Sequence, residues 1–329
     1  TADIMSNGDS HQQQQSAEPL VPEITDPEAE SLDFEHSRIG RLAGLECLTK
    51  IRALCFRNNL LKAIENVGCL AGTLTELDLY DNQIERLENL EQLTKLEHLD
   101  VSFNRLSKIE GLETLVRLRK LYLVQNRIGK IECLDSLIEL EILELGANRI
   151  RQIESLDTLT NLRELYLGSN KISRIEGLER LTQLRILALA ANRLTSIENL
   201  GHLTQLNELY LSENGIQRIE NLDTLTNLRI LDLAQNRISS LDNLSNLTSL
   251  EELWLDNNRL DNFAEIEKLT SLPRLSTVLF EHNPIFYTSD KTPDAAYRRK
   301  VLLILPQLKQ LDATLTSQQA ANELLGQSA

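Results

Sequence analysis

The sequence predicts an α/β solenoid in which short coils stack side by side and contribute their strands to one curved parallel sheet. Three observations lead to this fold class. One asparagine recurs every 22 residues, two apolar residues spaced two apart precede it, and apolar residues spaced three apart follow it. A fixed period of this length is typical of repeat architectures whose units fold only as an array. The recurring asparagines are Asn82, Asn104, Asn126, Asn148, Asn170, Asn192, Asn214, Asn236 and Asn258.

Each unit is expected to contain a short strand and a tighter return. Leu143 and Leu145 are two residues apart, which is the spacing of side chains on one face of a strand. Ile150, Ile153 and Leu156 are three apart, which fits 3₁₀ turns better than an α-helix. The asparagine follows the strand, where its amide can both donate and accept. We therefore predict that the asparagine column bonds the backbone of the turns and has a structural role.

The solenoid is expected to span residues 32–285 in about eleven to twelve units. Residues 1–31 contain few large apolar side chains and are predicted to be a disordered acidic tail, with Met5, the single methionine, as the natural start. Residues 286–314 are predicted to be a C-terminal cap, and residues 315–329 a second tail.

The cap is predicted from its own apolar spacing. Tyr297, Val301 and Leu305 are four residues apart, as on one face of an amphipathic helix, and a proline follows. Leu308 and Leu311 are expected to close the last coil.

Composition excludes several classes of function. The chain carries 34 basic and 49 acidic side chains, so the formal net charge is 34 − 49 = −15, which disfavours a nucleic-acid partner. No apolar run approaches the ~18 residues of a membrane helix, so no membrane segment is expected. Four cysteines without a C-x-x-C pair favour reduced thiols.

The candidate binding residues come from the strand positions that the repeat frame leaves free, between and beside its two apolar residues. The residue between the two apolar positions of each strand is predicted to face the concave surface. In successive units this column reads Cys55, Asp78, Asp100, Tyr122, Glu144, Tyr166, Ala188, Tyr210, Asp232, Trp254 and Leu279. The position two residues earlier adds Glu76, Glu164, Glu208 and Glu252.

The column predicts a protein-binding face. A single exposed carboxylate is more often a solvated surface charge, but four large aromatic side chains aligned on a solvent-facing sheet have no packing duty there. Tyrosine and tryptophan also dominate the energetics of protein interfaces. Carboxylates around such rings favour a partner that presents Lys and Arg beside apolar patches.

No catalytic arrangement is recognised in the sequence. The five histidines are scattered, with no H-E-x-x-H motif, no zinc-ligand spacing and no Gly-rich phosphate loop. His98, near Asp100, could be imagined as a base, but a polar interface residue is the favoured interpretation. We predict a protein that is not an enzyme and needs no cofactor or metal.

The repeat frame resembles the leucine-rich repeats. Its uninterrupted 22-residue phase, the phrase from Glu76 to Ile84, and the cap segments Tyr297–Pro306 and Leu311–Thr314 resemble the family of leucine-rich-repeat regulatory subunits of protein phosphatase 1, typified by regulatory subunit 7. The resemblance covers residues 32–314. Spliceosomal and ciliary repeat proteins share the frame, so a scaffold for such a partner is the alternative.

The resemblance implies a function. In that family the concave face grips the phosphatase catalytic subunit. The matching positions here are Asp100, Tyr122, Glu144, Tyr166, Asp232, Glu252, Trp254 and Leu279. Leu279 departs from the family, which tends to offer an aromatic residue there. The implied role is control of phosphatase activity, maturation or localisation in nucleus and cytoplasm, with mitotic functions. A further phosphatase inhibitor protein is a second expected partner, and the free protein is expected to be a monomer.

Overall fold

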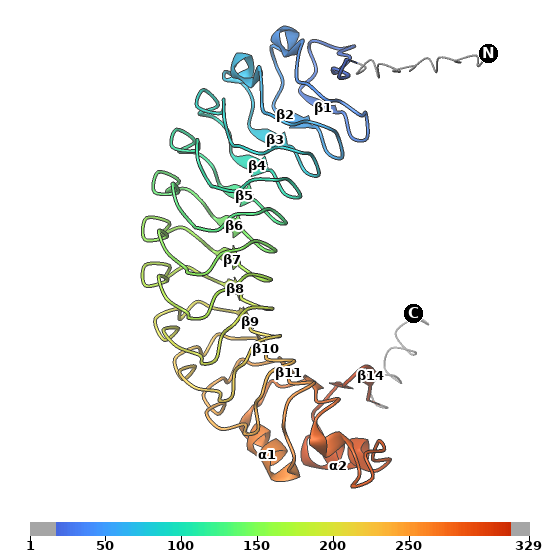
Figure 1. Cartoon of the computed structure of the whole chain (residues 1–329). Helices are drawn as coiled ribbons and strands as arrows, with labels where there is room; N and C mark the ends of the chain where they lie inside the picture. The colour runs from blue at the N-terminus through green and yellow to red at the C-terminus, as the bar shows by residue number, and fades with distance from the viewer. Residues whose placement is uncertain (1–17, 317–329) are drawn as a thin grey trace, which may run out of the picture.

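The computed structural model describes residues 18–316, which form an arc of stacked coils with the two ends of the chain at opposite ends of the arc (Figure 1). Within these residues, fourteen strands form one sheet in chain order. All neighbouring strands are parallel except the last pair, which is antiparallel. The strands are β1 (Ser31–Asp33), β2 (Ala53–Cys55), β3 (Glu76–Asp78), β4 (His98–Asp100), β5 (Lys120–Tyr122), β6 (Ile142–Glu144), β7 (Glu164–Tyr166), β8 (Ile186–Ala188), β9 (Glu208–Tyr210), β10 (Ile230–Asp232), β11 (Glu252–Trp254), β12 (Thr277–Leu279), β13 (Gln310–Leu311) and β14 (Thr314–Leu315).

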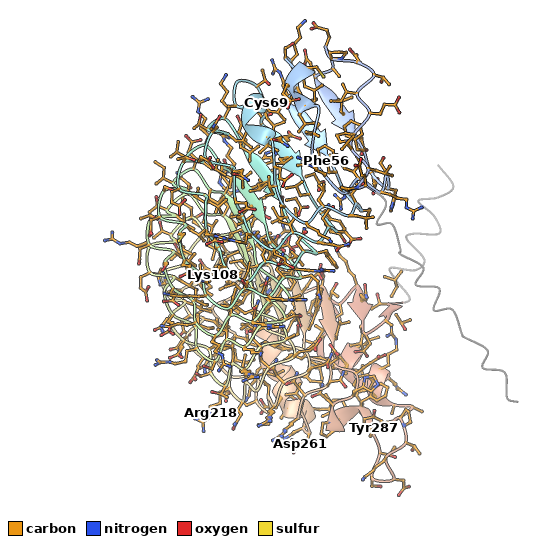
Figure 2. The ribbon with its side chains drawn as sticks, turned by 45° about the horizontal axis from the view of Figure 1, so that its top comes forward. Phe56, Cys69, Lys108, Arg218, Asp261 and Tyr287 are labelled. Atoms are coloured by element: carbon orange, nitrogen blue, oxygen red, sulfur yellow. The ribbon has the colours of Figure 1, made fainter. Side chains whose placement is uncertain are left out.

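Helices are short and lie mainly near the two ends of the arc. The α-helices are α1 (Phe263–Glu267) and α2 (Tyr297–Ile304), and the 3₁₀ helices are η1 (Leu45–Cys47), η2 (Val67–Leu70), η3 (Lys268–Ser271) and η4 (Pro284–Phe286). Figure 2 places Cys69 at the N-terminal end of the molecule and Asp261 and Tyr287 at the C-terminal end. No helix found between residues 18 and 316 combines the length and apolar character needed to cross a membrane.

The 22-residue period sets the register of the sheet. Leu99 pairs with Leu121 and Leu121 with Leu143, so equivalent residues of successive coils lie side by side. These leucines are fully buried, and the frame positions form one continuous core along the arc. The curved parallel sheet on the concave side is therefore confirmed.

The return part of each coil is a series of tight turns. The N–H of Leu115 donates to the carbonyl of Leu112 at 3.0 Å, and that of Leu118 donates to Leu115 at 2.9 Å. Bonds between residues three apart are those of a 3₁₀ helix. The prediction of 3₁₀-type spacing is confirmed, although most coils form separate turns rather than a helix.

The asparagine column bonds the turns, as predicted. Asn148 accepts the N–H of Ile128 through Oδ1 at 3.0 Å and donates through Nδ2 to Leu123 O at 2.9 Å and Leu145 O at 3.0 Å. One amide thus satisfies backbone groups of its own coil and of the preceding one. Equivalent bonds recur along the array, as at Asn104.

A second asparagine ladder was not predicted. The Nδ2 atoms of Asn199 and Asn221 each donate to a carbonyl of the preceding coil, Ile175 O and Ile197 O, at 2.7 Å. Asn243 does the same to Ile219 O at 2.8 Å. The ladder also operates at Asn66 and Asn89, but Gly111, Cys133, Ser155 and Gly177 interrupt it between the two halves.

The C-terminal cap confirms the predicted helix. Tyr297, Val301 and Leu305 are buried, as are the leucines expected to close the last coil. Asp312 follows the pair of Val278 and Leu311, so it lies in line with Leu279 and not with the ladder asparagines. Its Oδ1 accepts the N–H of Phe280 at 2.7 Å, and its Oδ2 accepts the hydroxyl of Tyr297 at 3.1 Å. The cap therefore satisfies the backbone that the last coil would otherwise expose.

The prediction of a disordered tail over residues 1–31 is wrong for its second part. Leu20 O accepts the N–H of Gly40 at 2.9 Å, Glu30 O accepts the N–H of Arg52 at 2.7 Å, and Ile24 packs against the core. Carbonyl groups of this segment thus pair with the first coil. Residues 1–17 lie outside the described residues. Of the second expected tail, 315–329, Leu315 belongs to β14 and 317–329 lie outside the described part.

Candidate protein-binding face

The sheet column is the row of residues at the third position of the strands, from Cys55 in β2 to Leu279 in β12. In β7, Leu165 is fully buried, whereas Glu164 and Tyr166 on either side are only half-buried. The parallel register sets Tyr166 directly beside Glu144 and Ala188. The structure therefore aligns the predicted residues on the exposed side of one sheet.

Three of the four aromatic side chains of the column are held by glutamates of their own strands. Three such bonds recur: Tyr166 Oη to Glu164 Oε2 at 2.8 Å, Tyr210 Oη to Glu208 Oε2 at 2.7 Å, and Trp254 Nε1 to Glu252 Oε2 at 3.3 Å. Burial and then these bonds raise the pKa of both tyrosines, which keeps the hydroxyls protonated as donors. The Glu-Leu-aromatic strands of β7, β9 and β11 thus present oriented rings, at low entropic cost to a partner.

The middle of the column carries two carboxylates that form no ion pair within the described residues. These are Asp100 and Glu144, which flank Tyr122. Burial raises the pKa of Glu144, and the charges of Asp100 and Glu164 raise it further. A cationic group placed here would relieve both the desolvation and the mutual repulsion.

Asp232 is the predicted binding residue whose position differs most from expectation. It lies between Tyr210 and Trp254 in the register, and only 6 % of its surface is exposed. The ring centroids of Tyr210 and Trp254 are 6.2 Å apart, less than two strand spacings of ~4.8 Å, so the rings lean toward each other across Asp232. Its Oδ1 accepts the N–H of Ala234 at 3.0 Å, and burial raises its pKa.

The N-terminal part of the column is different because a cation is already present. Arg57 Nη1 lies 3.1 Å from Asp78 Oδ2, and its guanidinium carbon lies 4.2 Å above the ring of Tyr80. Arg57 and Asp78 border a hollow of about 510 Å³ that His98 and Asp100 also line. Sequence reasoning missed Arg57 because it lies two positions beyond the column. Asp78 is therefore partly neutralised before any partner arrives.

The remaining column residues fit a contact role rather than a chemical one. Leu279 is half-buried beside Trp254 in the register and ends the column with an apolar side chain. Burial raises the pKa of the Cys55 thiol to about 12, so it stays protonated. His98 Nδ1 lies 3.3 Å from Glu76 Oε1. In the described part of the chain, no group of three His, Cys, Asp or Glu side chains is arranged to hold a metal ion.

Family models agree with the architecture. The leucine-rich-repeat model matches residues 183–326, a second model matches 116–172, and a two-copy model matches 73–114 and 160–202. The chain belongs to the leucine-rich-repeat proteins. Among solved structures, this leucine-rich-repeat protein is similar to an internalin of Listeria monocytogenes, with a TM-score of 0.69 and 25 % identity over 87 % of each chain.

Parts of the chain are similar to regulatory subunits of protein phosphatase 1 from several organisms. The protein is 56 % identical over 54 residues to protein phosphatase 1 regulatory subunit 7 of Xenopus tropicalis. It is 46 % identical over 87 residues to protein phosphatase 1 regulatory subunit SDS22 of Schizosaccharomyces pombe. These segments are 16 % and 26 % of this chain, and they span 15 % and 25 % of the two relatives. The predicted resemblance to the phosphatase regulatory subunits is confirmed at this level.

Proposed function

We propose that this protein is a non-catalytic regulatory subunit that binds the catalytic subunit of protein phosphatase 1 through the sheet column. The observation that carries the proposal is a line of oriented rings bordered by carboxylates on one exposed sheet. The names of the curated relatives support the choice of phosphatase.

The two halves of the column contribute differently. Trp254 and Tyr210 form the apolar anchor, since large rings near the centre of an interface commonly contribute ~2 kcal/mol or more. Asp100 and Glu144 attract Lys or Arg side chains, which speeds encounter and excludes acidic partners. When a basic side chain approaches Asp232, the rings of Tyr210 and Trp254 form the walls of its binding site.

In this proposal, binding of the phosphatase is sufficient for its regulation. We propose that the leucine-rich-repeat protein acts by holding the phosphatase and changing its activity, maturation or location. We propose that it does so in nucleus and cytoplasm and contributes to cell-cycle control, with a phosphatase inhibitor protein as an additional partner and a monomeric free state.

Calorimetric titration with purified phosphatase catalytic subunit tests the proposed face. The double variant Trp254→Ala/Glu252→Ala should bind at least about 30-fold more weakly, because it removes a large ring of the proposed anchor and the carboxylate that orients it. A matched control is Glu113→Ala/Val116→Ala, which changes an exposed acid and an exposed apolar residue in the turns. Both variants should keep the far-UV circular dichroism of the parent. Undiminished affinity in the first variant would reject the sheet column as the binding face.

A further inference from the structure

A basic residue follows the ladder asparagine in most coils, on the edge where each strand turns away from the sheet. We call the row formed by five consecutive coils the basic edge. It consists of Arg105, Arg127, Arg149, Lys171 and Arg193. Arg237 and Arg259 continue it beyond Gly215. The 22-residue register places equivalent positions in line, so the basic edge runs parallel to the sheet column.

The charges of the basic edge are unpaired. Four of its five side chains are exposed and Lys171 is half-buried, and the ion pairs within residues 18–316 include none of them. The next basic position along the coil behaves differently. Arg86, for example, pairs with Glu110 at 3.0 Å, and Arg174 pairs with Glu198 at 3.3 Å. Like charges on neighbouring coils repel one another, so the row is not explained by stabilisation of the fold.

The strip around the basic edge contains no acidic residue. The positions two residues before and two after each basic residue are Phe103, Ser107, Gln125, Gly129, Ala147, Arg151, Ser169, Ser173, Ala191 and Thr195. Carboxylates border the strip on both sides, with the sheet column on one side and the glutamates at 110, 132, 154, 176 and 198 on the other. The positive surface is therefore long and narrow.

A hollow and an exposed ring lie at one end of the strip. The hollow has a volume of about 400 Å³. Its lining includes Phe103, three arginines of the row and one carboxylate from the preceding coil: Arg105, Arg127, Arg149 and Asp81. Phe103 is 41 % exposed and has a φ of 54°, a conformation that bulky residues rarely adopt. Its ring packs on Tyr80 with centroids 4.8 Å apart. An exposed phenylalanine in a left-handed conformation contributes little to the core.

We propose that the basic edge binds an extended acidic segment of a partner protein, with an apolar side chain of that segment placed against Phe103. The five coils span about 20 Å at ~4.8 Å per coil, which about six extended residues cover. An extended peptide directs alternate side chains to one side, so its carboxylates can face the arginines while its other side chains point away from the bordering acids. This surface has the opposite charge to the sheet column. Its proposed role does not depend on the proposed binding of a phosphatase.

Fluorescence anisotropy tests the proposal with the full chain at 150 mM salt. The probes are two fluorescein-labelled octapeptides, each with seven alternating Glu and Asp residues and one phenylalanine. The phenylalanine is the first residue of one peptide and the last residue of the other. Arg127→Glu/Arg149→Glu should weaken binding at least ten-fold. The matched control Arg117→Glu/Arg180→Glu makes the same change in net charge on exposed turns of the same region and should change affinity less than two-fold.

The ring is tested separately. Phe103→Asn should abolish the preference for the phenylalanine peptide over one with alanine in its place, while the melting temperature does not fall, because asparagine tolerates a positive φ. Absence of peptide binding, or equal losses in the two charge-reversal variants, would overturn the proposal. Tighter binding of a labelled 12-nucleotide oligothymidylate that is lost in Arg127→Glu/Arg149→Glu would overturn it in favour of a nucleic acid.

Discussion

The aspartates of the sheet column show how one side chain serves the fold and remains open to a partner. Asp78 and Asp100 each accept, through Oδ1, the N–H of the residue two positions later, at 3.0 and 2.8 Å. One oxygen therefore holds the turn after the strand, and the other can meet a cation, as Asp78 already does with Arg57. Glu144 has no such backbone bond, and the raised pKa of its half-buried carboxyl indicates that its charge costs stability in the folded protein.

We expect Glu144→Gln to raise the melting temperature at pH 7 and to lose this advantage near pH 4. The folded-state pKa of Glu144 is raised above its usual ~4.3, so the folded protein binds this proton more readily than the unfolded chain. The wild-type protein is therefore penalised above the raised pKa and regains stability as the pH falls through it. Thermal unfolding followed by circular dichroism at both pH values measures the difference.

The control for this prediction is Glu113→Gln, which neutralises an exposed glutamate in an outer turn. It should change the melting temperature less than Glu144→Gln at pH 7. A Glu144→Gln variant that melts below the wild-type protein at pH 7 would contradict the assignment of an unfavourable charge to the sheet column.

At the scale of the coil, the sequence predicts strand, turns and first ladder because each depends on residues at fixed spacing. Leu143, Leu145 and Asn148 recur with the same meaning in neighbouring units. The second ladder was not predicted from the sequence because only half of its positions hold asparagine. Its bonds also reach a carbonyl about one coil back, as from Asn199 to Ile175. A bond between coils leaves no spacing signal when the residue type varies.

The gap in the second ladder predicts a stabilising substitution. Ser155 has the same positive φ, 57°, as the ladder asparagines, for example 58° at Asn199. Ser155→Asn should let the new amide donate to Ile131 O, the carbonyl that corresponds to Ile175, and asparagine also tolerates this φ better than serine. One such bond should add ~1 kcal/mol to the free energy of unfolding, measured by urea denaturation.

Ser155→Ala is the matched control, because it adds no amide and gains no tolerance of the positive φ. It should leave the urea midpoint unchanged or lower it. Equal midpoints for Ser155→Asn and the wild-type protein would show that the missing bonds of the central coils cost nothing.

For the molecule as a whole, the period predicts the arc but not the distribution of charge over it. The sequence places Tyr122 and Tyr166 on one face because side chains alternate along a strand. It does not reveal that the rings of Tyr210 and Trp254 approach to 6.2 Å, since this depends on side chains leaning across a strand. Nor does composition predict that residues 18–31 pair with the first coil, because their bonds use backbone carbonyls.

Deleting residues 140–161 should shorten the arc by one coil without unfolding it. The deletion joins Glu139 to Leu162, which occupies the frame position of Leu140, so register, core and ladder continue. It removes β6 and sets Tyr122 beside Tyr166. We therefore expect unchanged circular dichroism per residue and a loss of phosphatase affinity, because the anchors are displaced by one strand spacing of ~4.8 Å.

Deleting residues 140–150 provides the contrast. Removing 11 residues brings the frame half a period out of phase, which places polar residues in the core and should unfold the adjacent coils. Comparable thermal unfolding of the two deletion variants would contradict the view that the 22-residue register sustains the array.

Trp254 is the single tryptophan of the sequence, and its indole lies on the sheet column, 6.2 Å from the ring of Tyr210 and bonded to Glu252. The intrinsic fluorescence of the protein, excited at wavelengths that tyrosine does not absorb, therefore originates from one place only. The wavelength and intensity of its emission report whether that indole is exposed to solvent or covered by a partner. The molecule thus carries an optical sensor of its own occupancy, readable without any label.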